Sequence, residues 1–224
     1  MSLPAAVLWD MDGLMVDTEP LWTQAEHELA RRCGGVFTPQ AKAAIVGTRL
    51  DVAVPRLLQH FGVQPTEDRV AEETAWLLAR MVRLFDRPVT LLPGVEELLG
   101  VLARADVPQA LVSSSYRVLV DAVLAQGMGP FAITLSGDEV AQGKPDPEPY
   151  LTAARRLEAA PTHCVVLEDS PSGVAAGQAA GCAVVAVPNV AEVSFPLGRA
   201  TIVVASLEQV DLPCLQRLAA AARD

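Results

Sequence analysis

The chain has 224 residues, of which 51% are hydrophobic, 20% charged and 4% aromatic, a composition that excludes both a disordered chain and a membrane-embedded protein. At about 150 residues per domain, the length predicts a soluble globular protein of one or two domains. The 17 basic and 27 acidic residues give a net charge of -10, which repels polyphosphate and argues against nucleic acid as a partner.

The four cysteines, at positions 33, 164, 182 and 214, lie far apart and form no C-x-x-C pair. With only three histidines in the chain, they offer no zinc motif, and we interpret them as free thiols in a reducing compartment. The apolar run at 4–9 is too short for a signal peptide and is followed at once by Asp10. No stretch approaches the ~20 apolar residues of a membrane span. We therefore expect a cytoplasmic protein without a membrane partner.

The first apolar run, at 6–10, predicts a buried strand. From residue 17 to about residue 88 the pattern is helical, with helices expected at 20–32, 39–45, 51–60 and 67–85. This interval reads as a helical bundle inserted after the first strand. We place the domain boundaries accordingly: residues 1–16 and 89–224 form a discontinuous core, and residues 17–88 form the inserted domain.

Beyond the insertion, strands and helices alternate. Further strands are expected at 110–114, 132–136, 164–169, 183–187 and 201–206, and helices at 94–104, 117–126, 147–158 and 171–180. Near-continuous apolar runs are typical of strands covered on both faces, and strand-helix alternation implies right-handed crossovers. The predicted fold class is α/β, a Rossmann-like doubly wound parallel sheet with an inserted helical bundle.

Ligands of such sheets bind beyond the carboxyl ends of the strands, so the residues that follow each apolar run are the candidate site. Asp10 and Asp12 follow the first run, and Gly13 permits a sharp turn there. For this pair alone, the alternative is two turn-forming acids ahead of a helix that Asp17 or Thr18 caps.

Other strand ends carry hydroxyls and acids. Residues 113–115 are serines, which alone are typical of a turn or a helix cap. Glu168 and Asp169 end a later strand; Ser170 suits a helix N-cap, but a cap does not explain two acids there. With Asp10 they converge on one edge, where repulsion would be relieved by a hard divalent cation. The sequence therefore predicts Mg²⁺.

Lys144 lies in GKPDPEPYL, ahead of a helix that Asp146 can cap. Its alternative is a solvated loop lysine. The segment GDEVAQGK departs from a nucleotide-binding P-loop, because five residues separate Gly137 from Gly143 and Pro145 stands where a Ser or Thr is required. No G-x-G-x-x-G follows the first strand, so nucleotide cofactors are not supported.

Taken in order, DMDGLMVDTEP, SSS, GKPDPEPYL and LEDSPSGVAAGQAAG resemble the haloacid dehalogenase superfamily, and within it the phosphatases and β-phosphoglucomutases with a helical cap. The resemblance covers nearly the whole chain. It implies that Asp10 is the nucleophile and Asp12 the general acid/base. The phosphate ligands that it implies are Ser113 and Lys144. The magnesium ligands that it implies are Asp10, the Asp12 carbonyl, Asp169 and Glu168.

A narrower resemblance concerns DTEPLWTQAE, VGTRLDVAV and LLPGVEELL, which are similar to hexose-phosphate and 2-deoxyglucose-6-phosphate phosphatases of this group. The mutases carry a cap histidine at the position of Trp22, and its absence favours hydrolysis over mutation. Arg49 and Trp22 in the cap, together with Ser114, are the expected substrate-binding residues. The alternative for Arg49 is a surface arginine within the bundle.

The sequence thus predicts a Mg²⁺-dependent phosphomonoester hydrolase that acts on small phosphorylated sugars through an aspartyl-phosphate intermediate. It leaves the oligomeric state open, and we favour a monomer. A β-phosphoglucomutase-type mutase is the first alternative. A non-catalytic phosphate sensor on the same fold is the second, and the presence of both a nucleophile and an adjacent acid/base argues against it.

Overall fold

The computed structural model describes residues 2–188 and 201–222. Its strands form one parallel sheet of six strands in the order β3-β2-β1-β4-β5-β6, which is the order of doubly wound dinucleotide-binding sheets. The strands are β1 (Ala6–Trp9), β2 (Gln109–Val112), β3 (Ile133–Leu135), β4 (Cys164–Glu168), β5 (Ala183–Ala186) and β6 (Thr201–Val203). The predicted α/β class is confirmed, and each strand falls in one of the predicted apolar runs to within a residue.

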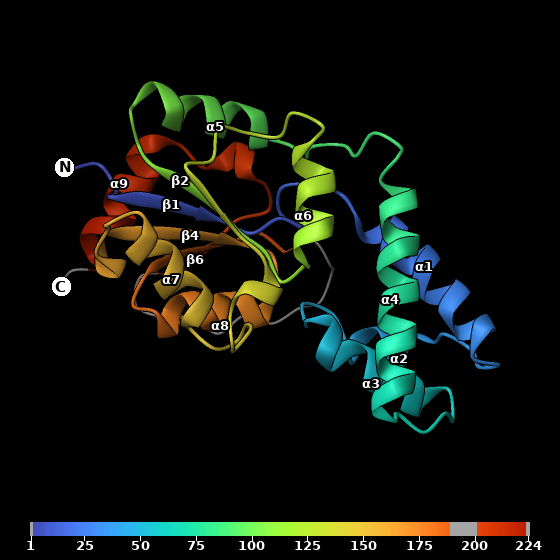
Figure 1. The fold of residues 1–224 in the computed structure, drawn as a ribbon. Helices are drawn as coiled ribbons and strands as arrows, with labels where there is room; N and C mark the ends of the chain where they lie inside the picture. Colours follow the sequence, from blue (N-terminus) through green and yellow to red (C-terminus); the bar gives the residue numbers. More distant parts are fainter. Residues whose placement is uncertain (1, 189–200, 223–224) are drawn as a thin grey trace.

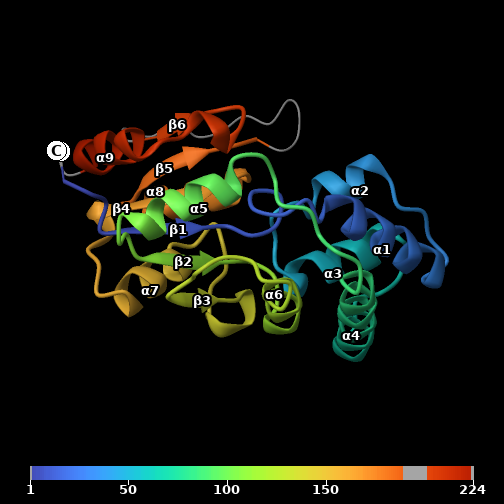
Figure 2. The same ribbon diagram turned by 90° about the horizontal axis from the view of Figure 1, so that it is seen from above.

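Helices cover both faces of this sheet. Figure 1 and Figure 2 show α5 and α9 on one face and α7 and α8 on the other. Along β1, Val7 and Trp9 belong to one apolar cluster and Leu8 to the opposite one. This two-sided burial is why the strands read as continuous apolar runs. The core helices are α5 (Val95–Arg104), α6 (Arg117–Leu124), α7 (Glu148–Arg156), α8 (Pro171–Ala179) and α9 (Leu212–Ala221).

The sequence patterns did not reveal α9. Its N-cap is Asp211, whose Oδ1 accepts a hydrogen bond from the Cys214 amide at 2.7 Å, and Pro213 stands in its first turn. Both are helix-start signals. Leu215, Leu218 and Ala219 form its buried face, at the three- and four-residue spacing of an amphipathic helix.

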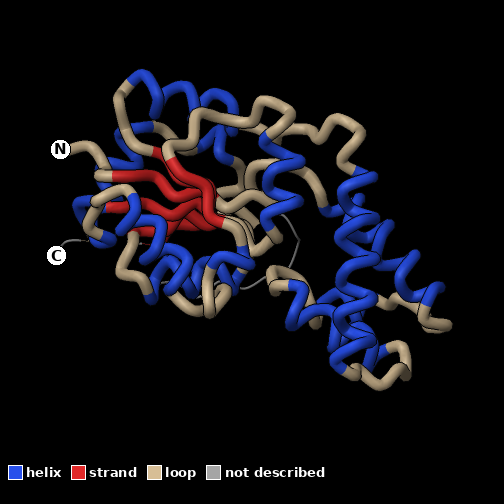
Figure 3. The backbone as a smooth tube through the Cα atoms, viewed as in Figure 1, coloured by secondary structure: helices blue, strands red, loops and turns tan. Residues whose placement is uncertain are grey.

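The helices between β1 and α5 form a separate body beside the sheet, here called the cap (Figure 1, Figure 3). The longest of them, α4, packs against both α1 and α3. The observed bounds agree with the predicted helical pattern to within two residues at each end. The cap helices are α1 (Glu19–Arg32), α2 (Pro39–Ala43), α3 (Leu50–His60) and α4 (Glu67–Leu84).

The chain passes between core and cap twice, and the two passages lie side by side. Val16 forms an antiparallel bridge with Leu91. The Asp17 amide donates to the Thr90 carbonyl at 3.1 Å, and the Leu92 amide donates to the Met15 carbonyl at 3.0 Å. We propose that the domain boundaries lie at this paired connection, one between residues 16 and 17 and the other between residues 88 and 89.

Two further features concern membrane-spanning helices and the state of the cysteines. None of the described helices combines the length and the apolar character needed to cross a membrane. All four cysteines carry free thiols, with Cys164 and Cys182 buried and Cys33 and Cys214 half-buried. This arrangement agrees with the interpretation of the cysteines as unpaired thiols.

Candidate active site

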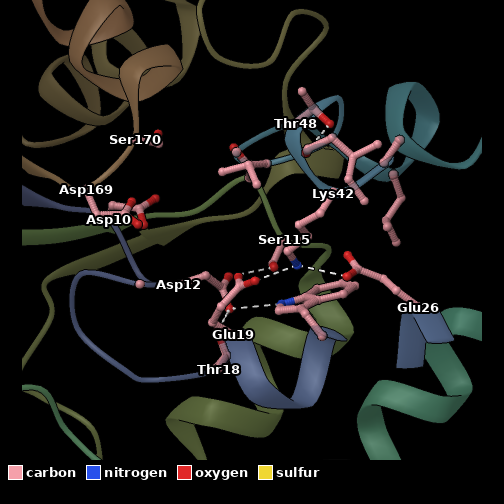
Figure 4. A pocket seen from close by; sticks show the side chains of 18 residues that line it. Asp10, Asp12, Thr18, Glu19, Glu26, Lys42, Thr48, Ser115, Asp169 and Ser170 are labelled. Atoms are coloured by element: carbon pink, nitrogen blue, oxygen red, sulfur yellow. Dashed lines mark hydrogen bonds and ion pairs between the residues drawn. The ribbon is translucent and has the colours of Figure 1, made fainter. Parts of the chain in front are cut away.

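The carboxyl ends of β1, β2 and β4 meet at the edge of the sheet that faces the cap, and a cavity of about 900 Å³, partly open to solvent, lies there. Both the core and the cap contribute to its walls (Figure 4). The core residues that line it include Asp10, Asp12, Ser114, Ser115, Asp169 and Ser170, and the cap residues include Glu19, Trp22, Glu26, Lys42 and Thr48.

Lys144 is buried, unlike the solvated loop lysine considered as its alternative. Its Nζ donates to Asp10 Oδ1 and Glu168 Oε1 at 2.6 Å each and to the Val112 carbonyl at 3.0 Å. Burial acts to lower the pKa of Lys144, but the charges of Asp10 and Glu168 outweigh it and raise that pKa above its usual value. The ammonium group therefore stays charged beside Asp10.

Glu168 is fully buried and hydrogen-bonded at both carboxylate oxygens. Oε1 accepts from Lys144 and from the Tyr150 hydroxyl, the latter at 2.8 Å. Oε2 accepts from the amides of Asp169 and Ser170 and from the Ser170 hydroxyl, each at 3.0 Å. A Cβ at Gly173 would lie 1.7 Å from Oε1, so α8 packs directly on this carboxylate. These contacts fix Glu168 against both Lys144 and the start of α8.

Asp10, Glu168 and Asp169 each offer a carboxylate oxygen, and these atoms lie within 4.8 Å of one another. Burial raises the pKa of Asp10 to about 8; Lys144 opposes the shift, and the charges of Glu168 and Asp12 add to it. Burial and the charge of Asp10 likewise raise the pKa of Asp169 well above its usual value. In the part of the chain that the structure describes, no group donates a hydrogen bond to the Asp169 carboxylate. Clustered oxygen ligands with raised pKa values fit a hard divalent cation such as Mg²⁺.

Asp12 is held by donors from both the cap and the core. Its Oδ1 accepts from the Thr18 hydroxyl at 2.6 Å and from the Trp22 indole nitrogen at 3.4 Å. Its Oδ2 accepts from the hydroxyls of Ser115 at 2.7 Å and Ser113 at 3.4 Å. Thr18 occupies the N-cap position of α1 without a side-chain capping bond, so helix capping does not account for its hydroxyl. These bonds orient the Asp12 carboxylate on the cavity wall.

The serines after β2 take different positions. Ser113 is buried, its Oγ accepts from the Ser115 amide at 3.0 Å, and it is absent from the cavity lining. Ser114 and Ser115 line the cavity. Ser115 belongs to the predicted serine cluster but was not singled out, because nothing in three consecutive serines shows which of them faces the cavity.

Of the two cap residues expected to bind substrate, Trp22 lines the cavity and Arg49 does not. The Arg49 guanidinium pairs with Asp51 and donates to the Val140 carbonyl at 3.0 Å. A Cβ at Gly143 would lie 2.3 Å from Arg49 Cδ. Arg49 thus lies across the core loop that leads into Lys144, and the expectation that it reaches the substrate has no support in this geometry.

The cap brings three charged side chains to the cavity that no motif indicated. Lys42 of α2 pairs with Glu19 at 2.6 Å and with Glu26 at 2.8 Å, both on α1. Burial raises the pKa of Glu26, and Lys42 opposes this shift. Glu19 and Glu26 are two helical turns apart, so they share a face of α1. The spacing of Glu19 and Glu26 was the one feature of the sequence that could have indicated this cluster of charged side chains.

Known proteins are similar to this chain in sequence and in fold. The family described as haloacid dehalogenase-like hydrolase matches residues 4–181, and the chain belongs to this family. It is 34% identical over 204 residues to hexitol phosphatase A of Escherichia coli (strain K12), covering 91% of both chains. It is 33% identical over 182 residues to a phosphorylated carbohydrates phosphatase of Thermotoga maritima, covering 79% of this chain and 81% of the relative.

Among solved structures, CbbY from Rhodobacter sphaeroides in complex with phosphate matches with a TM-score of 0.85 and 26% identity, covering 96% of this chain and all of that one (100%). The resemblance to helical-cap members of the superfamily is confirmed. The protein is a phosphatase of the haloacid dehalogenase type, that is, a phosphoric monoester hydrolase.

Proposed function

We propose that this protein is a Mg²⁺-dependent phosphatase of small phosphorylated sugars and that Asp10 forms an aspartyl-phosphate intermediate. The observation that supports this most is the convergence of Asp10, Lys144 and Asp169 at one sheet edge, with Asp12 oriented on the wall of the same cavity. The printed names of the two relatives, a hexitol phosphatase and a phosphatase of phosphorylated carbohydrates, support the sugar class.

In the first step, a carboxylate oxygen of Asp10 attacks the phosphorus atom, and the bond from phosphorus to the ester oxygen breaks. Asp12 gives its proton to that oxygen, so the sugar leaves as an alcohol. In the second step, Asp12 takes a proton from the water molecule whose oxygen attacks phosphorus. The bond to Asp10 then breaks, and inorganic phosphate is released.

Asp10, Asp169 and the Asp12 carbonyl are the proposed ligands of Mg²⁺, whose charge offsets the repulsion between a carboxylate and a phosphate dianion. Lys144 and the serine hydroxyls that follow β2, of which those of Ser114 and Ser115 belong to residues lining the cavity, are proposed to bind the phosphoryl oxygens. Glu168 was expected among the ligands. We assign it instead the positioning of Lys144 and of the loop at Ser170, because both of its oxygens already accept hydrogen bonds.

Release of inorganic phosphate from 4-nitrophenyl phosphate tests this function. We expect turnover with Mg²⁺, loss of turnover in EDTA and recovery when Mg²⁺ is restored. Asp10→Asn removes the nucleophile and should lower kcat by about a thousandfold or more. Asp121→Asn, at an exposed position on α6, is the control and should keep the wild-type rate. Full activity after exhaustive metal removal, or in Asp10→Asn, would contradict the proposed mechanism.

A further inference from the structure

The cavity has two chemically different ends. Asp10 and Asp169 lie together at one end, whereas Lys42 and Glu26 lie across from them in the cap (Figure 4). The phosphoryl group must reach Asp10 to react. The leaving group of a bound substrate therefore extends toward Lys42 and Glu26.

The cap end is built around one buried carboxylate. Glu26 is 4% exposed, and only its Oε2 is bonded, to Lys42 Nζ. Within the described part of the chain, no group donates a hydrogen bond to Glu26 Oε1. This oxygen is also not completely enclosed by protein, so a ligand can reach it. Lys42 uses its ammonium hydrogens on Glu26 and Glu19, and an ammonium group has three of them. One acceptor and one donor are thus left for a ligand at this end.

We propose that Glu26 and Lys42 determine specificity by binding hydroxyl groups of the leaving group, and that Glu26 together with Glu19 excludes leaving groups with a second phosphate or a carboxylate. The inference rests on the proposed function and narrows its substrate class to monophosphates of neutral polyols and sugars. A free carboxylate oxygen beside an ammonium matches a hydroxyl, which both donates and accepts. A second phosphate would meet two carboxylates against one ammonium, and this repulsion is strong in a poorly hydrated cavity.

The alternative is that the Lys42 pairs merely fasten α2 to α1. The two interpretations differ in what the charge does to substrate choice. A structural ion pair affects stability and leaves the ratio of rates between two substrates unchanged, whereas a specificity residue alters that ratio.

The experiment compares glucose 6-phosphate, glucose 1,6-bisphosphate and 4-nitrophenyl phosphate as substrates with Mg²⁺. Wild-type kcat/KM should be at least about tenfold higher for the monophosphate than for the bisphosphate. Glu26→Gln keeps the size of the side chain but removes its charge, and should raise the bisphosphate-to-monophosphate ratio about tenfold. Lys42→Met should lower the ratio of glucose 6-phosphate to aryl phosphate turnover by a similar factor. Glu28→Gln, on the same helix but paired with Arg80, should leave both ratios unchanged.

Glu19→Gln, at a more exposed carboxylate, provides a second variant if Glu26→Gln does not fold, and should raise the bisphosphate ratio in the same direction. Unchanged ratios in both glutamine variants, with aryl phosphate still hydrolysed, would overturn this inference and leave the proposed function intact. A wild-type protein that hydrolyses none of the three compounds would refute the proposed function and, with it, this inference.

Discussion

Asp10 lies where three acidic groups meet one buried ammonium, so its protonation couples the metal site to the stability of the fold. Burial raises the pKa of Asp10 to about 8 from an ordinary value of 3.8. Between these values the native protein holds a proton that the unfolded chain has lost. Raising the pH through this window therefore favours unfolding, and the stabilising contribution is fully present only below the unfolded pKa.

We expect the free energy of unfolding in EDTA to fall as the pH rises from about 5 to about 8, by up to about 1.4 kcal/mol per pH unit for each such group. Urea titrations at several pH values measure this slope. Asp10→Asn cannot ionise and should flatten it, and Mg²⁺ should reduce it in the wild type because the ion favours the ionised carboxylates. Parallel slopes for the wild type and Asp10→Asn would show that Asp10 is already ionised in the metal-free protein.

The sequence could place some site residues and not others. Asp10 and Asp169 directly follow β1 and β4, and Asp12 lies two residues beyond Asp10. Parallel strands bring such positions to one edge of the sheet. Lys144 is anchored to Asp10 across 134 positions of sequence, and only its motif pointed to it. Lys42 and Glu26 meet because α2 docks on α1, a contact that depends on the packing of the whole cap. The direction of Arg49 depends on how cap and core meet, which no local pattern specifies.

At the scale of elements, the start of α8 is fitted to β4 through Gly173. The glycines of GVAAGQAAG pack closely on the sheet: a Cβ at Gly177 would lie 3.1 Å from Val184, and one at Gly173 would collide with Glu168. The hydroxyl of Ser170 caps α8 by accepting from the Gly173 amide at 3.1 Å. The same turn therefore starts the helix, seats Glu168 and presents Asp169 to the cavity.

Gly173→Ala should therefore destabilise the protein by about 1–3 kcal/mol, the usual cost of overpacking, and should lower kcat because the displaced Glu168 no longer holds Lys144. Gly100→Ala is the matched control: it lies inside α5, where a new Cβ meets only the end of the Arg104 side chain at 3.2 Å. That change should be neutral or stabilise by up to about 1 kcal/mol. Urea unfolding and phosphate release measure both effects. Equal stabilities of the two variants would show that α8 does not pack closely on the Glu168 carboxylate at Gly173.

The strands and most helices could be predicted because burial on both faces and amphipathic spacing are local properties of the sequence. Pro20, Pro39 and Ser170 mark helix starts that the structure shows within a residue of their expected positions. The order of the strands depends on the crossovers, and apolar runs carry no information about which neighbours pair. Helix α9 was not predicted, although its start signals and the apolar spacing of Leu215, Leu218 and Ala219 are both present in the sequence.

At the scale of the whole molecule, cap and core touch through the loop between α2 and α3. On one side of this loop, the Ser172 hydroxyl donates to the Gly47 carbonyl at 3.1 Å. On the other side, Arg49 donates to the Val140 carbonyl and lies against Gly143. The loop is thus held between the segment that carries Asp169 and the segment that carries Lys144. Closure of the cap and the positions of two core site residues are therefore connected.

This arrangement changes what is expected of Arg49. Replacing an arginine that touched the sugar would change kcat/KM by different factors for different substrates. Replacing one that holds the cap against the core would lower kcat/KM for every substrate, because closure of the cap and the exclusion of water are impaired. Arg49→Ala should lower kcat/KM by about tenfold for sugar phosphates and for 4-nitrophenyl phosphate alike, since a hydrogen bond from a charged donor contributes about 1.5–3 kcal/mol. Arg56→Ala, on the helix α3 that follows Arg49, is the control, because Arg56 is exposed and, among the described residues, bonds only to the Ala44 carbonyl within the cap. A change in the rank order of substrates in Arg49→Ala would show that Arg49 does reach the leaving group, and that the contact with Val140 belongs to a state other than the one in which substrate binds.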